Sequence, residues 1–167
     1  MDEAHHDLYQ KIINYSLDDP TARFPLLHRV ALENRWSHPY AQRVGYEYLR
    51  FAFLCVISDF PLTPSDEIDQ VWHMHILYTR DYEEFCEHYL GKKLHHGPTK
   101  GGKEEQEKYD YWYKRTLQFY ESVFHHPPPE DIWLPAEIRF QKAHWIRLNA
   151  LNHIIIKIPR WLQKLLS

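Results

Sequence analysis

The side chains best suited to chemistry in this 167-residue sequence lie in segment 66–75, which reads DEIDQVWHMH. On a helix, Asp69 and His73 are four residues apart and therefore lie on one face. His75 lies about 200° around the helix axis from His73, so their imidazoles point in nearly opposite directions. A carboxylate and an imidazole at this spacing supply half of a metal site. They equally suit a pair in which the carboxylate orients the imidazole.

A third ligand would come from the histidine pair His95 and His96, which follows Gly91. When a helix ends at a glycine, the chain can turn back, and this turn can bring the histidine pair close to Asp69 and His73. Two histidines and one carboxylate leave coordination positions open, as in catalytic zinc and non-haem iron(II) sites. The sequence therefore predicts a divalent metal, zinc or iron, held by Asp69, His73 and His96, with His95 as the alternative loop ligand. In the other interpretation, Asp69 and His73 form an ordinary hydrogen-bonded pair beside a polar loop.

The same segment also carries a family resemblance. Two runs resemble the glycine-rich domain-containing protein-like family: 68–80 (IDQVWHMHILYTR) and 94–102 (LHHGPTKGG). The tyrosine, Phe-Cys and glycine positions between these runs also match. The resemblance covers about residues 60–140 and implies a helical fold without a particular reaction. It places the aspartate, tryptophan and histidines of the D-x-x-W-H-x-H and loop motifs on Asp69, Trp72, His73, His75 and His96. Segment 154–159 departs from the family pattern, since it lacks the expected tryptophan.

The elements that position these residues are predicted to be helices. The apolar spacing and the breakers around it predict helices over about 2–17, 25–34, 65–90 and 103–124, and a further helix that follows Ser37 and is broken by the stretch 60–64. Ser37 and Ser65 suit N-caps, Gly91 suits a helix end, and a bend is expected near Arg80. The fold class is therefore mainly α, a single compact helical domain over 1–167 with an irregular C-terminal segment.

Two faces of these helices are predicted to be buried. In the helix after Ser37 the core positions are Val44, Tyr48, Phe51, Ala52, Cys55 and Val56. In the helix after Ser65, His75 aligns with Ile68, Trp72, Thr79 and Tyr82 on the core face. Cys86 is also expected to be a small core residue rather than a nucleophile.

Composition limits the function classes. Two cysteines make no disulfide framework, which predicts a reducing cytoplasmic location. Residues 1–138 hold 14 basic and 23 acidic residues, whereas residues 139–167 hold six basic residues and no acid. An acidic body argues against nucleic-acid binding, and we find no transmembrane stretch. The partner would be a small molecule or a protein. Whether the chain is an enzyme, and its oligomeric state, are not predicted.

The basic tail, about 141–167, stands apart from the family-like core. Segment 152–158 suits either a strand or a buried helix. After Pro159, Trp161, Leu162, Leu165 and Leu166 predict a short amphipathic helix. This helix would either dock on the acidic body, which we favour, or make weak contact with an anionic membrane. For the whole chain, the alternative to a metal-binding domain is a non-catalytic interaction domain in which the Trp-His-x-His segment is structural.

Overall fold

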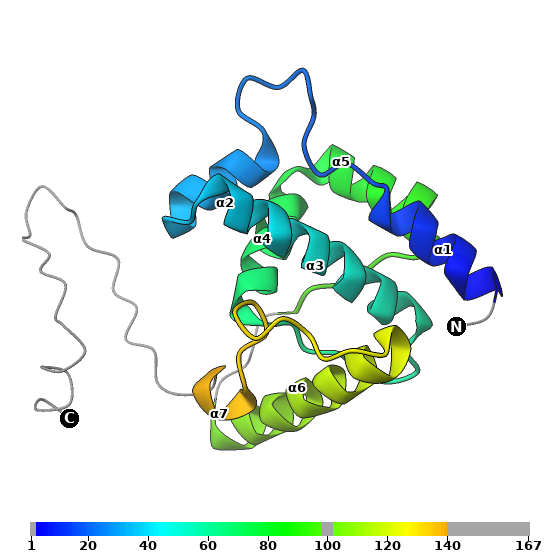
Figure 1. The fold of residues 1–167 in the computed structure, drawn as a ribbon, viewed down its shortest axis with the longest axis vertical. Helices are drawn as coiled ribbons and strands as arrows, with labels where there is room; N and C mark the ends of the chain where they lie inside the picture. Colours follow the sequence, from blue (N-terminus) through cyan, green and yellow to red (C-terminus); the bar gives the residue numbers. More distant parts are fainter. Residues whose placement is uncertain (1–2, 98–101, 140–167) are drawn as a thin grey trace, which may run out of the picture.

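Helix α3 (His38–Ile57) forms the centre of the fold in the computed structural model, which describes residues 3–97 and 102–139. The Ser37 hydroxyl accepts a hydrogen bond from the Tyr40 amide at 3.3 Å, and Pro39 occupies the first turn, so the predicted start is confirmed. Helix α3 packs against α1 (Glu3–Ile13), α2 (Leu26–Asn34) and α4 (Asp66–Leu77), as Figure 1 shows. Its predicted core residues Val44, Tyr48, Phe51 and Ala52 are fully buried, whereas Cys55 and Val56 are half-buried.

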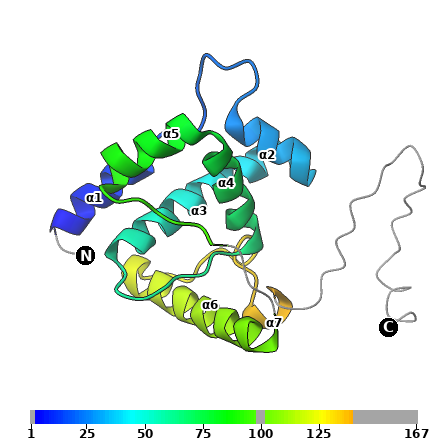
Figure 2. The same ribbon diagram turned by 180° about the vertical axis from the view of Figure 1, so that it is seen from behind.

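The remaining elements are also helical. They are α5 (Thr79–Glu84), the π-helical turn η1 (Phe85–Leu90), α6 (Lys103–Phe124) and α7 (Ala136–Arg139). Helices α6 and α7 lie at one end of the molecule and α1, α2 and α5 at the other, with α3 between them (Figures 1 and 2). The described residues contain no strand, which confirms the mainly α fold class.

The first helix is shorter than predicted, since it ends at Ile13 rather than near residue 17. The Tyr15 amide donates to the Ile12 carbonyl at 3.0 Å, which tightens the chain into a turn. The Tyr15 ring then packs against Phe85 and Tyr89, with centroids 4.6 and 4.7 Å away. The helix therefore ends where Tyr15 turns to pack on these distant aromatic residues.

The predicted helix 65–90 is divided at Tyr78, two residues before the expected bend. Tyr78 adopts φ −86° and ψ 64°, and its hydroxyl accepts a hydrogen bond from Arg29 Nε of α2 at 3.0 Å. The break changes the helical phase, so the prediction that Thr79 shares the core face of His75 was wrong: Thr79 is exposed, while Tyr82 is buried. Gly91, with φ 70°, ends η1 as predicted.

Helix α6 has the predicted bounds and ends at Phe124, and the next residue, His125, turns the chain with a φ of 60° before the three prolines. Its buried residues Tyr113, Thr116 and Tyr120 face the core. The Thr116 hydroxyl accepts from the Thr63 amide at 3.0 Å, which ties the linker before α4 to α6.

The predictions for the tail, including segment 152–158 and the helix after Pro159, lie outside the described residues. Among the helices that are described, none is long and apolar enough to cross a bilayer. Cys55 and Cys86 are both free thiols, and Cys86 is buried as predicted.

Candidate metal centre

Helix α4 presents its polar and buried histidines on opposite sides. The Ser65 hydroxyl caps the helix by accepting from the Ile68 amide at 3.3 Å. His75 is fully buried, with Tyr48 Oη 3.0 Å from Nδ1 and Tyr15 Oη 3.4 Å from Nε2. Burial lowers the pKa of His75 to about 4, so its imidazole is neutral near pH 7. Both ring nitrogens have protein partners, and His75 is therefore a core residue, as predicted.

The loop after η1 is fastened to α4 by a chain of hydrogen bonds. Trp72 Nε1 donates to Tyr82 Oη at 3.0 Å, and that hydroxyl donates to the Leu94 carbonyl at 2.6 Å. The Leu94 side chain is buried, so His95 is exposed and His96 points inward. The His96 ring meets the Trp72 ring edge-on, with centroids 4.6 Å apart. Burial of Leu94 thus selects His96, rather than His95, to face α4.

Asp69, His73 and His96 meet at one point. His96 Nε2 lies 2.8 Å from Asp69 Oδ1 and 3.1 Å from His73 Nε2, and His73 Nε2 lies 3.5 Å from Asp69 Oδ2. Ligands bound to tetrahedral zinc at about 2.0–2.1 Å are roughly 3.3 Å apart, and the observed separations bracket this value. The three residues therefore offer one ligand atom each to a common point, and the geometry could hold a metal ion.

The hydrogen-bonding capacity of this cluster is compatible with a metal-free network and also with a cation. An ionised carboxylate only accepts hydrogen bonds, and each neutral imidazole has one N–H. Without a metal, His96 Nε2 can donate to Asp69 Oδ1 at 2.8 Å and His73 Nε2 to Asp69 Oδ2 at 3.5 Å, but the two nitrogens, 3.1 Å apart, then share no hydrogen bond. A metal ion at the centre would accept electron pairs from all three atoms at once. The side chain of His73 is 49% exposed, which leaves one side of the cluster open to solvent.

The other candidate residues lie elsewhere. His126 contacts Arg50 of α3, and neither it nor His125 joins the cluster. Desolvation raises the pKa of the half-buried Cys55 thiol to about 12, which suits an unreactive cysteine.

Sequence reasoning missed the Tyr82 hydroxyl as the residue that holds the loop. It also missed Glu47, a carboxylate buried in the apolar face of α3. A charged residue four positions before the core residue Phe51 was a signal that could have found it.

Comparison with known proteins gives a family. A protein-family model described as UCP032817-like matches residues 21–128, about two thirds of the chain. No curated protein matches the chain, and no solved structure does. The comparisons support neither the glycine-rich family name nor its motif. The matched range includes helix α2, the whole of α3 and α4, and all three residues of the cluster.

Proposed function

The chain belongs to the UCP032817-like family, and we propose that it is a helical domain that binds one divalent metal ion through Asp69, His73 and His96. The observation that carries this proposal is the convergence of one carboxylate oxygen and two imidazole nitrogens on one point. These atoms come from two segments, whose nearest ligands, His73 and His96, are 23 residues apart in the sequence. The hydrogen bonds of Tyr82 hold the two segments together. Zinc and iron(II) are the metals that this donor set favours.

The protein residues would have distinct tasks at such a site. Asp69 would supply the anionic oxygen, and His73 and His96 would supply neutral nitrogens through Nε2. Trp72 would limit the movement of the His96 ring by its edge-on contact at 4.6 Å. A metal ion with three protein ligands keeps a position for water or substrate, which is the arrangement of catalytic sites. The exposed side of His73 gives a solute access to that position.

One feature supports a second candidate function, a non-catalytic interaction domain. The bonds from Trp72 to Tyr82 and from Tyr82 to Leu94 fix the loop without any metal. Under this alternative, the carboxylate and the two imidazoles form a hydrogen-bonded knot that only shapes the surface. The two functions differ in whether the purified chain retains a metal ion.

Metal analysis of the untagged full chain tests the proposal. We expect about one zinc or iron per chain, and zinc competition with a chromophoric chelator should show at least tenfold weaker binding in His73→Ala and in His96→Ala. The matched control is His95→Ala, because His95 adjoins His96 in the loop but is exposed and outside the cluster. A wild-type chain that binds no zinc, or a control variant that loses it, would support the interaction domain instead.

A further inference from the structure

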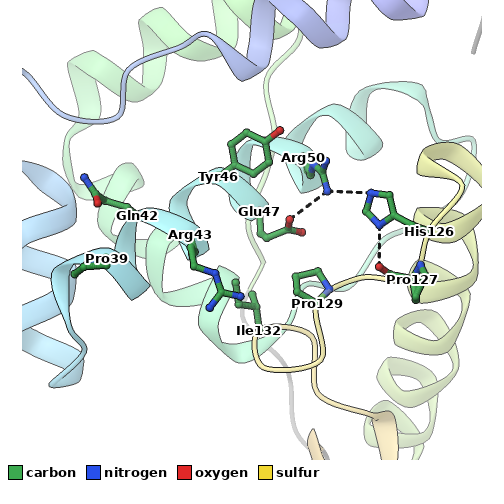
Figure 3. Close-up of a pocket in the computed structure, with 10 residues that line it drawn as sticks. All are labelled: Pro39, Gln42, Arg43, Tyr46, Glu47, Arg50, His126, Pro127, Pro129 and Ile132. Carbon is green, nitrogen blue, oxygen red and sulfur yellow. Dashed lines mark hydrogen bonds and ion pairs between the residues drawn. The ribbon is translucent and has the colours of Figure 1, made fainter.

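A second polar site lies on the face of α3 away from the metal cluster. A pocket of about 550 Å³ is lined by α3 and by the segment that follows α6 (Figure 3). Helix α3 lines it along the stripe from Pro39 to Arg50, and the later segment lines it from His126 to Ile132. None of these residues belongs to the candidate metal centre.

Glu47 forms the buried wall of this pocket, and both of its carboxylate oxygens already accept hydrogen bonds from the protein. Its carboxylate accepts hydrogen bonds from Trp133 Nε1 at 3.0 Å, from the Tyr120 hydroxyl at 3.3 Å and from Arg50 Nη1 at 3.4 Å. The residue is only 5% exposed. Because its charge faces Arg50 and its oxygens have donors, Glu47 offers little to a cationic ligand.

Arg50 has donors that the protein leaves unused. Its Nε donates to the Tyr9 hydroxyl at 3.3 Å, and its Nη1 contacts Tyr120, Glu47 and His126. Within residues 3–97 and 102–139, Nη2 has no hydrogen-bond acceptor. A guanidinium always carries its charge and matches the planar geometry of a carboxylate. Arg50 therefore presents an unfilled anion-binding group to the pocket.

His126 holds the guanidinium in this orientation. Its Nδ1 lies 2.9 Å from the Pro127 carbonyl, which can only accept, so Nδ1 carries the hydrogen. In that tautomer Nε2 can accept a hydrogen bond from Arg50 Nη1, 3.5 Å away (Figure 3). Nη1 is thus directed to protein partners, and Nη2 remains for a ligand.

The rest of the wall is apolar or already paired. Arg43 makes two hydrogen bonds to Asp131, at 2.7 and 2.9 Å, so its charge is compensated. Tyr46 and Pro129 supply accessible apolar surface above the buried Ile132, and the Tyr46 ring lies 5.0 Å from the Arg50 guanidinium carbon. We propose that this pocket binds a small organic carboxylate, whose charged group pairs with Arg50 and whose aromatic or aliphatic body lies against Tyr46 and Pro129.

Calorimetric titration of the full chain with sodium benzoate tests this site. We expect saturable binding in the millimolar range or tighter, and weaker binding of benzyl alcohol, which has the same ring without the charge. Arg50→Gln should weaken benzoate binding roughly tenfold, since it removes a charge-assisted contact. Tyr46→Ala removes apolar surface from a residue that is 45% exposed, and it should weaken binding without endangering the fold if Arg50→Gln does not fold.

Two variants serve as matched controls. Arg23→Gln removes an exposed arginine from the loop between α1 and α2, and Tyr111→Ala removes a tyrosine that is 53% exposed on α6. Both should bind benzoate like the wild type. The proposal is overturned if benzoate does not bind, or if Tyr46→Ala binds it as well as Tyr111→Ala does. Equal affinity for benzyl alcohol or inorganic phosphate would also contradict it.

Discussion

At the scale of single residues, the sequence was most informative where the relevant geometry is local. The pair Asp69 and His73 follows from helical spacing alone, as does the opposite direction of His75. The choice of His96 over His95 does not, since it depends on the burial of Leu94 and its bond to Tyr82. Glu47 could not be assigned a partner from sequence, because Trp133 and Tyr120 are 86 and 73 residues away.

The two histidines of α4 should respond differently to substitution. His75→Ala should lower the free energy of unfolding by roughly 2–4 kcal/mol, because it leaves a cavity and removes the partner of Tyr48. His73→Ala, on the exposed face, should change the stability of the metal-free chain by less than about 0.5 kcal/mol. Urea unfolding in the presence of a chelator measures both. A larger loss in His73→Ala than in His75→Ala would show that their faces are reversed.

The two thiols should react slowly in the folded protein. Burial raises the pKa of Cys55 to about 12, so little of its thiol is ionised at pH 8, and the buried Cys86 is shielded from reagents. We expect iodoacetamide at pH 8 to label the native chain at least 100-fold more slowly than the urea-unfolded chain, which should take up two labels. Mass spectrometry of digests identifies the labelled residue. Rapid native labelling of Cys86 would mark it as a functional residue.

At the scale of elements, helix starts and ends were predicted well because capping is local. Ser37, Ser65 and Gly91 have the predicted roles, each set by a residue type that suits the required backbone. The break at Tyr78 was misplaced because its hydroxyl is bound by Arg29 of a different helix. Early termination of α1 has the same kind of cause, since Tyr15 packs on η1. Tertiary contacts therefore account for both errors.

The bond between Tyr82 and the loop should support stability and metal binding together. Tyr82→Phe leaves Trp72 Nε1 and the Leu94 carbonyl without their partner, so the free energy of unfolding should fall by about 1–3 kcal/mol. Because His96 follows Leu94 by two residues, zinc affinity should fall about tenfold.

Tyr89→Phe is the matched control for this substitution. Tyr89 lies in η1, and its hydroxyl makes no hydrogen bond within residues 3–97 and 102–139. Thermal unfolding and chelator competition should therefore give wild-type values. Unchanged zinc affinity in a folded Tyr82→Phe chain would show that the loop holds His96 by other contacts.

At the scale of the whole molecule, the distribution of charge divides the chain into an acidic body and a basic tail. Residues 1–138 carry a net charge of −9 and residues 139–167 a net charge of +6. The helices around α3 already form a common core that reaches Trp133 and Ala136. We therefore propose that residues 1–167 form one domain, in which the basic segment is attracted to the acidic body.

The predicted helix after Pro159 gives the clearest test of this arrangement. Its apolar stripe is only two turns long, which gives weak membrane affinity by itself, whereas docking would bury the same side chains and bring opposite charges together. Deletion of residues 159–167 should therefore lower the midpoint of thermal unfolding by several degrees. The double variant Leu162→Ser/Leu165→Ser should reproduce most of this loss, and Gln163→Ser, from the opposite side of the same helix, should not. If the deleted chain melts like the full chain but no longer co-sediments with vesicles rich in anionic lipid, the tail is a membrane contact instead.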